Sequence, residues 1–202
     1  MRLLLISLTF FFSISSYAQD TLTVYFLHGS KPKRAHRDTE HKWFGGVLGG
    51  HVGLSIEKDQ VLNFVPTSFS GVFPNNKKKD NGRFISSTED GFWYIFGRVD
   101  SVKSTVYKVP ISKEQRQQFE SIYTNYLDET PYDYAFFGVR CGSSSYEILE
   151  QLDILKPIGI RKTPVYRIFY PKKLRKRLRR KAKKEGWERI RKEGVITRKW
   201  ER

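Results

Sequence analysis

Two residues that could perform acyl chemistry together lie at separate places in the sequence. Cys141 opens the segment Arg-Cys-Gly-Ser-Ser-Ser-Tyr-Glu-Ile-Leu, and His51 lies in Gly-Gly-His-Val-Gly-Leu, ninety residues upstream. The thiolate is the form that attacks a carbonyl carbon, and a free thiol with a pKa of about 8.5 is mostly protonated near pH 7. A histidine beside the thiol can take its proton on attack and give it to the leaving group. These residues predict a nucleophile, Cys141, and its base, His51.

The residues after Cys141 predict a helix that begins at the cysteine. Serines at 143–145 suit a first helical turn, and apolar residues follow at helical spacing up to Leu152. The free N–H groups and the dipole of a helix N-terminus stabilise a thiolate, so we expect a lowered pKa for Cys141. The same N–H groups could hold the oxyanion of a tetrahedral intermediate.

A third polar residue should orient the imidazole of His51. Strands are predicted at 52–56 and 61–65, with a turn between them. Because such a hairpin brings Asn63 beside the first strand, Asn63 is our candidate for this role. Glu57, which lies next to the turn, is the alternative.

Each of these residues also has a purely structural interpretation. A lone cysteine such as Cys141 is often a small buried hydrophobic residue. His51 could be a satisfied core histidine, and Asn63 could bind only the backbone. The spacing of the remaining histidines fits no standard zinc pattern, and there is no second cysteine. We therefore expect neither a metal nor a cofactor at His28, His36 and His41.

The order of predicted elements indicates an α+β fold with a mostly antiparallel sheet. Ser112 and Gln115 form a capping box that opens a helix running to about Leu127. Besides the hairpin and the helix at Cys141, the remaining predictions are strands at 21–28, 91–96, 104–109 and 165–169, a polar loop at 29–42 and a long exposed loop at 70–90.

The stretch from His51 to Pro66 resembles the histidine hairpin of the circularly permuted NlpC-type papain-like proteins, a group that includes lecithin:retinol acyltransferase and its relatives. In that family the base histidine begins one strand, a polar third member follows on the next, and the cysteine comes later at a helix start. Asn63 holds the third position, where the acyltransferase relatives usually carry a second histidine. The segment Tyr-Asp-Tyr-Ala-Phe-Phe-Gly-Val-Arg-Cys, which ends at Cys141, is similar to the family's aromatic approach to the nucleophile, with Arg140 in place of the common asparagine.

The resemblance covers about residues 22–170. It implies that residues 20–170 form a permuted papain-like domain, with a barrel-like antiparallel sheet packed on helices. It also implies a nucleophile at Cys141, a base at His51 and an orienting amide at Asn63.

The N-terminus reads as a signal peptide over residues 1–18. Arg2 precedes an apolar run from Leu3 to Phe12, and the segment ends at Ala18 in a small-x-small pattern. The apolar run is shorter than the ~20 residues that span a bilayer, although an uncleaved anchor is the alternative. We therefore expect an exported, periplasmic or secreted bacterial protein. Exported proteins usually pair their cysteines, which makes a single thiol unusual.

The last segment, residues 171–202, carries most of the charge. It holds sixteen Lys and Arg against four Glu, or +12 of the chain's net +16. Leu174, Leu178 and Ala182 form a narrow apolar stripe on an otherwise basic predicted helix. We expect a basic helical tail that binds an anionic membrane surface or envelope polymer, or that is simply solvated; export makes nucleic acid a poor candidate.

These features together predict an exported thiol hydrolase of the amidase or peptidase type, which cleaves an amide or ester bond in a cell-envelope peptide. One alternative is a lipid acyl hydrolase or acyltransferase at a membrane. The other is a non-catalytic binding module with an anion-binding tail.

Overall fold

The computed structural model describes residues 20–40, 49–67, 71–75, 77–96, 101–157 and 170–201. Three predictions therefore lie outside the described residues: the signal peptide, His41 and the strand at 165–169.

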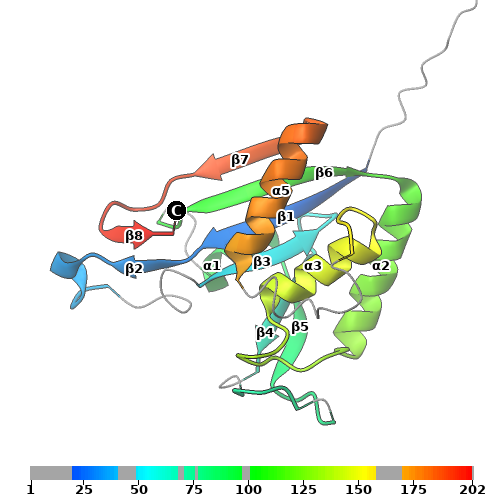
Figure 1. Ribbon diagram of the computed structural model, residues 1–202, viewed down its shortest axis with the longest axis horizontal. Coiled ribbons are helices and arrows are strands. Elements are labelled where there is room, and N and C mark those ends of the chain that lie inside the picture. The colour runs from blue at the N-terminus through cyan, green and yellow to red at the C-terminus, as the bar shows by residue number, and fades with distance from the viewer. Residues whose placement is uncertain are drawn as a thin grey trace, which may run out of the picture.

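Six antiparallel strands form one open sheet in the order β5-β4-β3-β1-β6-β7 (Figure 1). Their bounds are β1 Asp20–His28, β3 Gly50–Ser55, β4 Val61–Pro66, β5 Gly82–Ser87, β6 Ser104–Ile111 and β7 Glu188–Lys192. The α+β class, the β3–β4 hairpin and the strands near 21–28 and 104–109 are confirmed. The barrel-like closure is wrong for the described strands, because β5 and β7 end the sheet at opposite edges.

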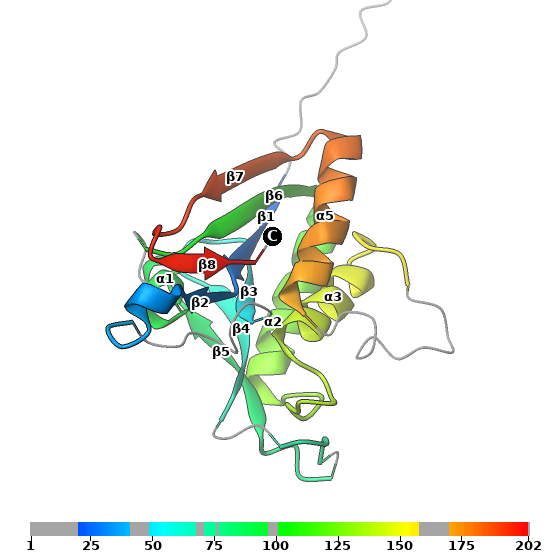
Figure 2. The same ribbon diagram turned by 60° about the vertical axis from the view of Figure 1, so that its left-hand side comes forward.

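Helices cover both faces of this sheet (Figure 2). The helices α2 (Lys113–Asp128), α3 (Cys141–Gln151) and α5 (Pro171–Glu185) lie on one face, and α1 (Glu89–Phe96) lies on the other. Strand side chains alternate between the faces. Val24 and Phe26 of β1 pack beneath the three helices, whereas Tyr25 and Leu27 pack on the side of α1.

The helices near Ser112 and Cys141 begin where the sequence predicts. The Ser112 Oγ accepts a hydrogen bond from the Gln115 N–H at 3.2 Å, and the Gln115 side chain accepts one from the Ser112 N–H at 2.9 Å. This capping box satisfies two N–H groups that a helix end otherwise leaves unpaired. Phe119 and Ile122 of α2 are buried against the sheet, as their spacing implies.

Residues 91–96 form a helix, so the strand predicted there is wrong. Thr88 caps the start of this helix, because its Oγ1 accepts a hydrogen bond from the Gly91 N–H at 2.9 Å. The negative charges of Glu89 and Asp90 in the first turn stabilise the positive end of the helix dipole. The preceding segment is not all loop, because 82–87 pairs with β4 as an edge strand. The expected loop at 29–42 likewise contains β2 (Ser30–Pro32) and a short 3₁₀ helix, Arg34–His36.

The basic segment is a helix, as predicted, but it belongs to the fold. Leu174, Leu178 and Ala182 of α5 are buried in the main core. The chain then adds β7 to the edge of the sheet beside β6, and β8 (Arg198–Trp200) pairs with β2 in a small second sheet. The apolar stripe of the segment predicted as a basic tail is therefore used for packing against the sheet. Across the part of the chain that the structure describes, no helix is long and apolar enough to cross a membrane.

Candidate active site

The β3–β4 hairpin brings His51 and Asn63 into direct contact. The His51 Nε2 and the Asn63 Oδ1 are 3.2 Å apart. The amide nitrogen of Asn63 donates to the carbonyl of Val61 at 2.8 Å and to the Ser87 hydroxyl at 3.0 Å, which fixes its orientation. Since the amide oxygen can only accept, Nε2 carries the imidazole proton and Nδ1 keeps its lone pair. Asn63 therefore sets the tautomer that a base acting through Nδ1 requires.

The backbone around His51 leaves little space beside the ring. A Cβ on Gly53 would lie 2.8 Å from the Phe92 ring and 3.0 Å from the Asn63 Oδ1, so only glycine fits there without a shift. The centroids of the His51 and Phe92 rings are 5.8 Å apart, and His51 is only 4% exposed. Burial lowers the pKa of His51 to about 4, although the hydrogen bond with Asn63 acts to raise it. The imidazole is therefore neutral at physiological pH.

Cys141 is the first residue of α3, and its thiol is buried. The Ser143 Oγ accepts a hydrogen bond from the Arg140 N–H at 2.8 Å and so caps the helix start. Burial raises the pKa of the Cys141 thiol to about 11. The guanidinium of Arg140 and the N–H groups of Val52, Gly142 and Cys141 itself all lower this pKa, but they do not outweigh burial. The lowered pKa expected at a helix start is therefore corrected: the resting thiol is protonated.

The thiol reaches the histidine strand at the residue next to His51. The Val52 N–H is within hydrogen-bonding reach of the sulphur, and the Val52 side chain belongs to the core beneath α3. The imidazole of His51 projects from the same strand toward Phe92, on the side of α1. The structure thus joins His51 directly to Asn63 and brings Cys141 to the main chain of the strand that carries His51.

The alternative third member, Glu57, lies elsewhere. Its carboxylate forms an exposed ion pair with Arg116 at 2.8 Å. Asn63, which is fully buried, is the side chain that contacts the imidazole. Within the described ranges, no three His, Cys, Asp or Glu side chains gather as metal ligands would.

The roles of two residues around this site were not predicted from the sequence. Ser87 holds the amide of Asn63 from β5, within a segment expected to be loop. Tyr134 lies close enough to Cys141 and Arg140 for both to affect its pKa, which burial raises strongly. The aromatic segment 132–141, with Arg140 directly before Cys141, was the sequence signal that pointed to this neighbourhood.

The segment that leads into Cys141 is held by a buried carboxylate, Asp133. Its oxygens accept hydrogen bonds from the N–H groups of Asn75 and Asn81 at 2.6 and 2.9 Å, and from the Asn81 side chain at 2.8 Å. These bonds lower the pKa of Asp133 in spite of its burial. They tie residues 71–81 to the chain just before the cysteine. The two segments together expose an aromatic patch that comprises Phe73, Phe136 and Phe137, with the exposed aliphatic side chain of Val72 next to Phe73 in the chain.

Comparison with known proteins gives no relative for this chain. No protein-family model matches it, and neither the curated proteins nor the solved structures contain a significant match.

Proposed function

We propose that the chain is an exported thiol hydrolase with a permuted papain-like arrangement, in which Cys141 attacks an amide or ester carbonyl. His51 is the base and Asn63 orients it. The observation that carries this proposal is the hydrogen bond between the His51 Nε2 and the buried Asn63, on a strand whose next N–H contacts the thiol. Nucleophilic thiol catalysis requires a base imidazole held in one tautomer and a thiol at a helix start. Here the two groups are connected through the main chain of β3, which carries His51 and contacts the thiol at Val52.

The reaction begins from a neutral thiol and a neutral imidazole. As the sulphur forms its bond to the carbonyl carbon, the thiol proton passes to the Nδ1 of His51, and the carbonyl electrons move to the oxygen. The N–H groups at the start of α3 stabilise that oxyanion. The imidazolium then protonates the departing amine or alcohol. Water, deprotonated by the same imidazole, cleaves the thioester, and the proton returns to the thiolate as the acid leaves.

The aromatic patch favours a substrate that carries an apolar group. Phe73 is 70% exposed and stacks on Phe137, with the ring centroids 5.6 Å apart. Backbone hydrogen bonds from Phe136 to Gly71 and from Phe137 to Val72, each 2.8 Å long, fix both segments. Exposed apolar side chains grouped in this way are typical of binding surfaces. The patch suits an apolar side chain of an envelope peptide or, in the alternative hydrolase, an acyl chain.

A second candidate function is a binding module without catalysis. It is favoured by the 4% exposure of Cys141 and by the raised pKa of its thiol. Under this alternative, the cysteine is a core residue and the aromatic patch alone binds the ligand.

Detection of an acyl-enzyme distinguishes the two functions. The protein is incubated with p-nitrophenyl esters of increasing chain length and with peptide p-nitroanilides, and adducts are sought by intact mass spectrometry. We expect an adduct on Cys141 that is absent from Cys141→Ala. His51→Ala should slow its formation by about 100-fold or more. Glu57→Gln, the matched control, should react as the parent does. No adduct with any substrate, or an adduct whose rate is unchanged by His51→Ala, would favour the binding module.

A further inference from the structure

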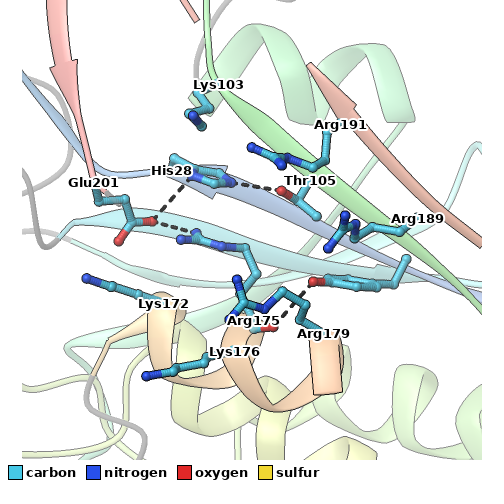
Figure 3. A pocket seen from close by; sticks show the side chains of 11 residues that line it. His28, Lys103, Thr105, Lys172, Arg175, Lys176, Arg179, Arg189, Arg191 and Glu201 are labelled. Carbon is cyan, nitrogen blue, oxygen red and sulfur yellow. Dashed lines mark hydrogen bonds and ion pairs between the residues drawn. The ribbon is translucent and has the colours of Figure 1, made fainter. Parts of the chain in front are cut away.

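A strongly cationic cavity of about 460 Å³ lies between α5 and the β6–β7 edge of the sheet (Figure 3). Seven Lys and Arg side chains line it, against a single carboxylate, Glu201. None of the residues proposed for catalysis is among them. Its volume is typical of small-molecule sites, which range over about 300–1,000 Å³.

The regular geometry of two elements directs these charges to one place. Lys172, Lys176 and Arg179 recur at three- and four-residue spacing on α5, and therefore share one face of the helix. Arg189 and Arg191 alternate along β7, opposite Tyr107 and Thr105 of β6, and so point to the face that α5 covers. Figure 3 shows the helix and strand cations on the two sides of the same space.

Only part of this charge is balanced. Arg175 of α5 forms a buried ion pair with Glu201 at 2.5 Å. At the rim, Lys103 and Arg191 contact Glu193 at 2.7 and 3.1 Å. The remaining cations of the lining form no ion pair within the described part of the chain; they are Lys172, Lys176, Arg179 and Arg189. Like charges gathered in this way repel each other unless an anion lies between them.

The nearby cations also affect His28, which lines the cavity and has a lowered pKa. The Nε2 of His28 hydrogen-bonds with the Thr105 Oγ1 at 2.9 Å. The pKa of His28 falls to about 2, first because of burial and then because of Arg175, Lys103 and Arg191. The neutral imidazole and the Thr105 hydroxyl are polar groups that could also contact a ligand at the base of the cavity.

We propose that this cavity binds an anion with at least two phosphate or sulfate groups. Four unbalanced cations exceed what one such group neutralises, and guanidinium groups on two sides suit bidentate contacts with phosphate oxygens. The shared chemistry can come from a soluble phosphorylated compound or from a phospholipid headgroup. The site is independent of the proposed hydrolase, because it uses none of Cys141, His51 and Asn63.

The test is calorimetric titration of the full chain with inorganic pyrophosphate and tripolyphosphate at low and high salt. The cavity variant is Lys176→Gln/Arg179→Gln. The matched control is Lys173→Gln/Arg180→Gln, which removes the same charges from exposed positions of α5 outside this cavity. We expect the cavity variant to bind pyrophosphate about tenfold or more weakly per lost contact, while the control stays within about threefold of the parent. Affinity should fall with salt. Equal melting temperatures establish that each variant is folded.

Two measurements distinguish a phospholipid headgroup from a soluble phosphorylated compound. In the first, the protein is sedimented with vesicles of phosphatidylcholine that contain cardiolipin. Vesicle binding that is lost in the cavity variant and reduced by added pyrophosphate would identify a phospholipid headgroup. Pyrophosphate binding without vesicle binding would identify a soluble compound. Either result supports the site. The absence of pyrophosphate binding, or an equal loss in the cavity and control variants, would overturn it.

Discussion

The titration of Cys141 is the most direct consequence of the site's geometry. A thiol with a pKa of about 11 has about one molecule in 10,000 ionised at pH 7. This is about 300-fold less thiolate than a free thiol with a pKa of about 8.5 provides at the same pH. Alkylation by iodoacetamide, which follows the thiolate, should therefore be slow at pH 7 and should rise about tenfold per pH unit through pH 10.

The neutral state of His51 sharpens this prediction. With its pKa near 4, the imidazole carries no positive charge across this range and cannot stabilise the thiolate as an ion pair. His51→Ala should leave the midpoint of the alkylation profile unchanged. Arg140→Gln should slow alkylation further, because the guanidinium lowers the thiol pKa, whereas Lys173→Gln, an exposed charge on α5, should not.

Rates are measured by intact mass from pH 6 to 11, with melting temperature followed in parallel. A raised acid pKa contributes stability that is present below pH 9 and lost as pH rises toward 11, by about 3 kcal/mol for the change in Cys141. Cys141→Ala should remove that loss. A reactivity plateau below pH 8 that vanishes in His51→Ala would refute the reasoning and indicate a preformed thiolate–imidazolium pair.

Three further predictions concern the fold around the site. Because His51 is buried and neutral, its contribution to stability should be lost as pH falls from 6.5 toward 4, by about 3 kcal/mol; His51→Gln should flatten this part of the urea-denaturation profile. Leu178→Ala should cost about 2–5 kcal/mol in urea unfolding, against a negligible change for the 84% exposed Ile196→Ala; equal effects would mean that α5 is not part of the core. Gly53→Ala should lower the melting temperature, because its Cβ would lie 2.7 Å from the Val61 Cγ1.

The burial of Leu178 and its neighbours bears on what the basic segment can bind. An amphipathic helix binds a membrane through its apolar stripe, but the stripe of α5 packs on the sheet. Its charged face remains, and part of that face lines the cavity with Arg189 and Arg191 of β7. Recognition of anions by this segment is therefore expected to depend on charge and shape, with a strong salt dependence.

Local patterns in the sequence were sufficient for several parts of the structure. The alternation in 21–28, the hairpin that carries His51 and Asn63, the capping box at Ser112 and the helix that begins at Cys141 all depend on residues close together in the chain. For the same reason the contact between His51 and Asn63 was predictable, since a hairpin places its two strands side by side.

Tertiary structure decided the features that depend on distant residues. The segment 91–96 is a run of aromatic and apolar residues of the kind that strands favour, yet it folds as a helix that buries Phe92 beside Tyr25 and Trp93. The helix start at Cys141 was predictable, but the pKa of its thiol was not, because desolvation depends on everything packed around the sulphur. The cationic cavity likewise exists only because α5 and β7 pack on the same face of the sheet. Hydrogen-bonding patterns and side-chain periodicity are local, whereas burial and electrostatic potential are sums over the whole fold.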